Sequence, residues 1–173
     1  MLNVIDKADV KDLVLFAVNT GLRQGELLSL QFRQVNFGNR TIVLDNQTHI
    51  TKSKKIRSVP LNETAFKIIQ NRNDGKSENV FTLRESGIKQ DWIVHNFKKY
   101  VLKADINPKL HFHSLRHTFA SWLVQSGVSI YNVSKLLGHS DIKTTEIYTH
   151  LRTEDLHNSI RILEGYSFNC EKK

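Results

Sequence analysis

Residues 113–125 read HSLRHTFASWLVQ, and this stretch decides how the C-terminal half of the chain is organised. Its apolar residues recur at intervals of three and four, which predicts a helix from Ser114 to Gln125. Ser126-Gly127 is a helix-stop signal directly after it. We expect the buried face of this helix to carry Leu115, Phe119, Trp122 and Leu123.

Two basic residues of this stretch, His113 and Arg116, project from the same side of a helical turn because they are three residues apart. Arg116 lies at the edge of the expected buried face, where an arginine needs an anionic partner. That partner is either an internal carboxylate or a nucleic-acid phosphate. His117 is four residues from His113, a spacing that also suits a metal-binding pair. No third ligand is evident, so we expect His117 to pack or hydrogen-bond locally.

Upstream, the first 30 residues predict two helices. Asp6 is the expected cap of the first, which ends at Gly21 in a left-handed conformation. Arg23 then begins a second, short helix that continues to Leu30. A turn followed by a helix N-terminus suits a phosphate contact. The alternative for Arg23 is an ordinary ion pair with Glu26.

Residues 35–60 have a different pattern, which predicts a small antiparallel sheet. Short β-prone runs occur at 35–37, 41–44, 49–51 and 57–59, with turn signals between them. Lys52 is expected where a strand enters its hairpin turn. Asn62 then caps another helix, and a further helix is expected over 92–102. Together with the helices, this sheet gives an α+β fold that is mainly α.

After Gln125, further helices are expected. Ser129 caps one that ends at Gly138, which His139 follows directly. Ser140 or Asp141 is expected to cap the helix that carries Tyr148. A last helix is expected from about residue 154 to 163.

Composition narrows the possible functions. The 173 residues suit one domain, and 25 Lys and Arg against 17 Asp and Glu give a net charge of +8. This excess favours a polyanionic partner. The single cysteine, Cys170, excludes a disulfide framework and a cluster of thiolate metal ligands. With no apolar run long enough for a membrane span, we expect a cytoplasmic protein with no membrane partner.

Four motifs along the chain carry a family resemblance. They are TGLRQGELLSL at 20–30, TKSKKIRSVPL at 51–61, HSLRHTFAS at 113–121, and LLGH at 136–139 leading to TTEIYTH at 144–150. In this order they resemble the catalytic domain of the tyrosine recombinases, the phage integrase family, from about Asp6 to His150. The resemblance implies a helical catalytic domain with a small sheet, and a site-specific recombinase or integrase. Such an enzyme cleaves and rejoins DNA through a 3′-phosphotyrosine and exchanges strands through a Holliday junction.

The resemblance also implies residue roles. It assigns catalysis to Arg23, Lys52, His113, Arg116, His139 and Tyr148. Tyr148 is the nucleophile, and it needs activation because an ordinary tyrosine has a pKa of about 10. Arg23, Arg116 and His139 contact the phosphate. His113 assists proton transfer, and Lys52 protonates the leaving oxygen.

The partner is expected to be double-stranded DNA, whose backbone Lys54, Lys55 and Arg57 contact. No metal or other cofactor is expected, because one ester replaces another. The chain is expected to form a tetramer on DNA and to be a monomer in isolation. A topoisomerase of type IB and a DNA-binding protein without catalysis are the alternatives.

The resemblance further implies that residues 1–173 form a single catalytic domain. The N-terminal core-binding and arm-binding domains of such enzymes are absent from these residues. Residues 151–173 are expected to form a helix and a tail. They either dock on a neighbouring protomer or pack on their own domain.

Overall fold

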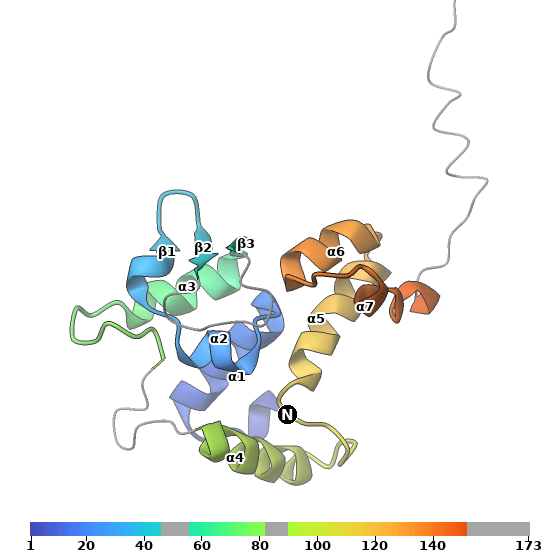
Figure 1. Ribbon diagram of the computed structural model, residues 1–173. Coiled ribbons are helices and arrows are strands. Elements are labelled where there is room, and N and C mark those ends of the chain that lie inside the picture. The colour runs from blue at the N-terminus through green and yellow to red at the C-terminus, as the bar shows by residue number, and fades with distance from the viewer. Residues whose placement is uncertain (46–55, 82–89, 152–173) are drawn as a thin grey trace, which may run out of the picture.

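The structure, a computed structural model, describes residues 1–45, 56–81 and 90–151 (Figure 1). Its helical elements are η1 (Leu2–Val4), α1 (Ala8–Thr20), α2 (Gln24–Leu28), η2 (Phe32–Gln34), α3 (Glu63–Arg72), α4 (Gln90–Lys103), α5 (Ser114–Gln125), α6 (Ile130–Leu137), α7 (Lys143–Glu146) and η3 (Thr149–Leu151). The strands are β1 (Val35–Asn36), β2 (Thr41–Leu44) and β3 (Arg57–Pro60). The mainly helical fold with one small sheet is therefore confirmed.

The sheet is antiparallel in the order β1-β2-β3. Ile42 is the register partner of both Val35 and Val59. Ile42, Leu44 and Val59 are buried, while Val43 and Ser58 face outward, as alternation along a half-buried strand requires. The runs expected at 35–37, 41–44 and 57–59 are confirmed. The run at 49–51 and the turn with Lys52, Lys54 and Lys55 lie outside the described residues, as does the helix expected near 154–163.

Helix α1 ends as the sequence predicts but begins differently. Gly21 adopts a left-handed conformation, with φ of 63°, and its N–H donates to the carbonyl of Ala17. A Cβ at Gly21 would lie 2.4 Å from the Phe119 ring, so glycine also permits the close approach of α5. The N-cap is Lys7. Asp6 does not cap the helix, because its carboxylate accepts a hydrogen bond from the Tyr100 hydroxyl at 2.5 Å.

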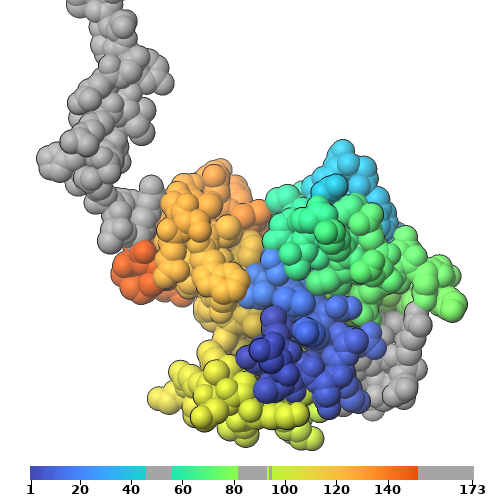
Figure 2. Space-filling view, turned by 180° about the vertical axis from the view of Figure 1, so that it is seen from behind, coloured from blue at the N-terminus to red at the C-terminus, as the bar shows by residue number. Residues whose placement is uncertain are grey.

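Two hydrophobic clusters hold the fold together, and α5 belongs to both. The larger cluster contains the buried residues of α1, α3, α4 and the sheet. The smaller is formed by Ala120, Val124, Val133, Leu137 and Tyr148. Figure 1 shows α5 standing between these two parts, with α6 and α7 on the far side from α1 and α2. From behind, the orange surface of the C-terminal part adjoins the blue and green N-terminal part (Figure 2).

The buried face of α5 differs in part from the expected one. Leu115, Phe119 and Leu123 are half-buried against the two clusters, but they are not the most enclosed residues of the helix. Its most buried residues are Arg116, Ala120 and Val124, whereas Trp122 is 56% exposed. The reason is that α5 contacts α1 on one side and α6 and η3 on another. The most buried residues of α5 therefore lie on the strip of its surface between α1 and α6, and the small side chain of Ala120 lets the neighbouring helices approach α5 closely. Arg116 is therefore buried at 4% exposure, and not at an edge.

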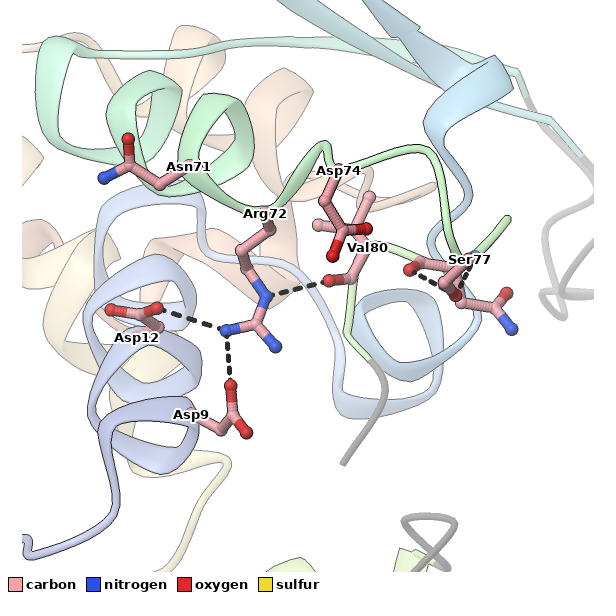
Figure 3. A pocket seen from close by; sticks show the side chains of 8 residues that line it. Asp9, Asp12, Asn71, Arg72, Asp74, Ser77 and Val80 are labelled. Atoms are coloured by element: carbon pink, nitrogen blue, oxygen red, sulfur yellow. Dashed lines mark hydrogen bonds and ion pairs between the residues drawn. The ribbon is translucent and has the colours of Figure 1, made fainter. Parts of the chain in front are cut away.

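An ion-pair junction joins α3 to α1 at a pocket (Figure 3). The Arg72 guanidinium donates to Asp9 at 2.9 Å and Asp12 at 3.1 Å, and its Nε donates to the carbonyl of Val80 at 2.9 Å. Both carboxylates are thus paired with Arg72, so the pocket is a structural junction. Among the residues that the structure describes, no helix has the length and apolarity to cross a membrane.

Candidate active site

Arg23 lies at the N-terminus of α2, where it is partly exposed. Its extended backbone follows the turn at Gly21, so its side chain leaves the end of the helix. One terminal nitrogen donates to Glu26 at 3.1 Å and the other to the carbonyl of Gly138 at 3.3 Å. The ion pair with Glu26 is present, but a third of the Arg23 side chain remains exposed (33%). Arg23 therefore keeps a solvent-facing surface that an anion can reach.

Glu26 is the carboxylate at the centre of this site. Both of its oxygens accept hydrogen bonds from Arg57 at 2.7 Å, and Oε2 also accepts from the backbone N–H of Arg23. Burial alone would raise the pKa of Glu26, but the hydrogen bonds and charge of Arg57, with those of Arg23, lower it to about 2. Glu26 is thus ionised at neutral pH and ties β3 to α2.

Arg57 was expected to contact the DNA backbone, but the structure places its guanidinium inside the protein. Its side chain is 11% exposed and is held by Glu26. A Cβ at Gly138 would lie 2.6 Å from Cδ of Arg57, so only glycine lets the two segments approach this closely. Gly138 also needs glycine for its φ of 66°, which ends α6 as predicted. Arg57 therefore supports the turn that precedes His139.

Arg116 joins two turns of the site. It donates to the carbonyl of Gly21 at 2.7 Å and to the carbonyl of Leu137 at 2.6 Å. Burial, together with the charge of Arg23, lowers the pKa of Arg116 to about 9, so it stays charged at neutral pH. Both of these partners are carbonyl oxygens, which do not neutralise the charge of Arg116. Three guanidinium groups and one carboxylate thus meet here, and the site carries excess positive charge.

His139 follows the Gly138 turn and is half-buried. Its Nδ1 lies 2.8 Å from Oγ1 of the fully buried Thr145. Burial, with the charges of Arg116, Arg23 and Arg57, lowers the pKa of His139 to about 4. The ring is therefore neutral at pH 7, and Thr145 fixes its orientation.

Tyr148 was expected on a helix capped by Ser140 or Asp141. The Asp141 carboxylate does accept the backbone N–H of Lys143 at the start of α7, but Tyr148 does not lie on this helix. Helix α7 has Ile142 as its N-cap and ends at Glu146, so Tyr148 lies between α7 and η3. Its ring belongs to the smaller hydrophobic cluster and is 6% exposed. Its hydroxyl lies 2.6 Å from Nδ1 of His117. Burial raises the pKa of Tyr148, and the charge of Arg116 partly opposes this.

The other two described tyrosines have different surroundings. Tyr100 donates to Asp6, and burial with this bond raises its pKa to about 12. Tyr131 is 59% exposed on α6. Tyr100 is bonded to Asp6, and the ring of Tyr131 lies under Lys135 of the same helix, so both are engaged away from the arginines of the site.

His113 precedes α5 and lies beside His117. Their rings meet edge to face, with centroids 5.0 Å apart. Burial lowers the pKa of His113, and the nearby charges of His117 and Arg116 lower it further. Within the described ranges, no three His, Cys, Asp or Glu side chains are grouped so that they could hold a metal ion.

The structure brings five of the six expected catalytic residues into one region. Arg23, Arg116 and His139 meet through the turns at Gly21 and Gly138, and α5 joins Arg116 to Tyr148 through His117. Lys52, with Lys54 and Lys55, lies outside the described residues. Sequence reasoning missed the Glu26–Arg57 pair and the contact of His117. His117 was expected to pack or hydrogen-bond locally, and no sequence signal indicated a partner 31 residues away.

Comparison with known proteins places the chain in a family. The profile described as "Phage integrase family" matches residues 1–155. The chain belongs to the phage integrase family. It is 34% identical over 160 residues to the tyrosine recombinase XerA of Saccharolobus solfataricus, covering 91% of this chain and 51% of that relative. The chain thus spans about half the length of the curated relatives it matches.

Solved structures of the family agree with the fold. The catalytic domain of bacteriophage HP1 integrase superposes with a TM-score of 0.72 at 29% identity, covering 96% of this chain and 90% of that domain. The Tn1549 transposon integrase, in complex with circular intermediate DNA, gives a TM-score of 0.70 at 26% identity. That match covers 94% of this chain and 62% of the other.

Proposed function

We propose that this chain is the catalytic domain of a site-specific DNA recombinase. It cleaves and rejoins DNA through a 3′-phosphotyrosine and exchanges strands through a Holliday junction. The observation that carries this proposal is the convergence of Arg23, Arg116 and His139 beside a buried tyrosine, Tyr148, in a chain of the phage integrase family.

The proposed reaction uses the charge of the site. Tyr148 attacks the phosphodiester, and the 5′-oxygen leaves. Arg23, Arg116 and a hydrogen bond from neutral His139 stabilise the negative charge that develops on the phosphoryl oxygens. His113 assists proton transfer at this end of α5, and Lys52 protonates the leaving oxygen. One ester replaces another, so the reaction as written consumes no ATP and needs no metal or other cofactor.

Double-stranded DNA is the proposed partner. The relatives include a transposon integrase in complex with DNA, and the net charge of +8 favours a polyanion here. Lys54 and Lys55 are proposed to contact the DNA backbone. We further propose a tetramer on DNA, a monomer in isolation, docking of residues 151–173 on a neighbouring protomer, and a cytoplasmic location.

A nicked substrate tests this function, because loss of a short 5′-hydroxyl fragment traps the covalent intermediate. Wild-type protein should form a protein–DNA adduct in EDTA, and Tyr148→Phe should bind the same DNA without forming one. Absence of a wild-type adduct would contradict cleavage, and a requirement for metal would contradict the mechanism. Relaxation of supercoiled DNA without recombination of paired sites would instead indicate a topoisomerase.

A further inference from the structure

His117 holds the Tyr148 hydroxyl, although the family motif assigned this histidine no role. Its Nδ1 lies 2.6 Å from the phenolic oxygen, and the two rings are tilted at 51° with centroids 6.0 Å apart. A separation of this size is within the reach of direct proton transfer. The contact thus places a titratable group on the atom that attacks phosphorus in the proposed reaction.

Packing fixes the Tyr148 side of the pair, and α5 positions the more exposed His117. The Tyr148 ring packs with Ala120, Val124, Val133 and Leu137, so the hydroxyl can point only where this cluster directs it. His117 is held by α5 and directly follows Arg116, whose guanidinium is anchored at the carbonyls of Gly21 and Leu137. The same turn of α5 therefore positions both the charge of Arg116 and the proton acceptor His117.

We propose that His117 is the general base for Tyr148. This inference rests on the proposed cleavage reaction. As the phenolic oxygen bonds to the scissile phosphorus, its proton passes to Nδ1 of His117, while the bond from phosphorus to the 5′-oxygen breaks. The 5′-oxygen takes its proton from Lys52, the proposed acid. Rejoining reverses each transfer, so His117 returns the proton to the tyrosine oxygen.

The protonation states at neutral pH agree with this role. Burial lowers the pKa of His117, and the charges of His111 and Arg116 lower it further. Burial raises the pKa of Tyr148. Tyr148 is thus protonated and donates, and the neutral His117 accepts at Nδ1. The charged and titratable groups around the pair are His111, His113 and Arg116 on the α5 side.

Cleavage of DNA that carries a 5′-bridging phosphorothiolate tests the general base separately from the general acid, because the sulfur leaving group needs no proton. His117→Asn keeps a hydrogen-bond acceptor near the position of Nδ1 but cannot take a proton. Its cleavage at pH 7 should be at least about 100-fold slower than wild type, the usual minimum for a general base. The exposed His95 on α4 provides the control, and His95→Asn should cleave at the wild-type rate.

The pH profile separates proton transfer from a purely structural effect. Wild-type cleavage should change little from pH 7 to 8, since His117 is already neutral there and Arg116, with a pKa of about 9, is still mostly charged. Cleavage by His117→Asn should rise about tenfold per pH unit, because it then depends on the small fraction of tyrosinate. A slow variant with a flat profile, or one as fast as wild type, overturns the inference. Faster cleavage by His117→Ala also overturns it and would identify His117 as an inhibitory latch.

A second measurement needs no cleavage. An NMR titration of the His117 ring should give a higher pKa in Tyr148→Phe than in wild type, because the donated hydrogen bond favours the neutral ring. An unchanged pKa would overturn the pairing. A wild-type protein that forms no adduct overturns the proposed function and with it the base. An adduct formed equally well by wild type and His117→Asn overturns only the inference.

Discussion

Replacement of Glu26 by glutamine removes the carboxylate that joins α2 to β3. Glu26 is 3% exposed and bonds Arg57 with both oxygens, while it also receives the backbone N–H and side chain of Arg23. Glutamine has a similar shape but no charge and only one acceptor oxygen. The Glu26→Gln variant therefore leaves the positive charge of Arg57 buried and unpaired, and Nε of Arg57 already has no hydrogen-bond partner among the residues that the structure describes.

The magnitude follows from the pKa of Glu26. A fall from 4.5 to about 2 corresponds to about 3 kcal/mol of stability at pH 7. A loss of this size should lower Tm by about 6–12 °C in a domain of this length. Because the folded-state pKa is depressed, the contribution is fully present above pH 4.5. It is lost as the pH falls from 4.5 toward 2.

Thermal unfolding of wild type and Glu26→Gln at pH 7, and then between pH 5 and 2, measures both effects. Wild-type Tm should fall toward that of the variant as the pH decreases. Glu63→Gln is the matched control, since Glu63 forms ion pairs on the surface and should change Tm little. Glu26→Gln/Arg57→Met should lose less stability than the two single changes combined. A Glu26→Gln variant with wild-type Tm at pH 7 would refute the reasoning.

Three further predictions concern the turns and the proposed chemistry. Gly138→Ala should lose about 2–4 kcal/mol in urea unfolding, because alanine is strained at this left-handed position and its Cβ would also clash with Arg57. Gly127→Ala is the control: Gly127 is also left-handed but has open space around it, so this variant should lose only about 1 kcal/mol. Equal losses in the two variants would contradict the close approach of Gly138 and Arg57. Arg116→Lys should slow adduct formation by at least about 100-fold, since an ammonium cannot replace the planar fork at two carbonyls, and an unimpaired variant would contradict its role. Lys52→Ala should regain cleavage on a 5′-bridging phosphorothiolate; rescue of Lys54→Ala or Lys55→Ala instead would reassign the acid.

Local signals in the sequence predicted the local structure well. Gly21 and Gly138 end their helices in left-handed conformations, and Asn62 and Ser129 cap theirs, since each of these features depends on a few neighbouring residues. The Ser-Gly stop after α5 was equally reliable. The helix-cap signal at Asp6 was not reliable, because the Asp6 carboxylate instead accepts a hydrogen bond from Tyr100, which is 94 residues away.

Burial and pairing across the chain were not predictable in the same way. Arg57 follows three lysines, which suggested a surface contact, but it is buried because Glu26 lies opposite. Trp122 is apolar yet exposed, because the neighbours of α5 cover a different line of the helix. His117 acquires its partner only because α7 ends at Glu146 and leaves Tyr148 in the smaller cluster. Each of these three outcomes depends on contacts between segments that are far apart in the sequence.

The most direct test of the account is to identify the residue that becomes linked to DNA. Wild-type protein is trapped on a nicked substrate, digested with protease and analysed by mass spectrometry. The account predicts a 3′-phosphate linked to the peptide that contains Tyr148, and no linkage in Tyr148→Phe. A linkage to Tyr100 or Tyr131, or an adduct that persists in Tyr148→Phe, would contradict it.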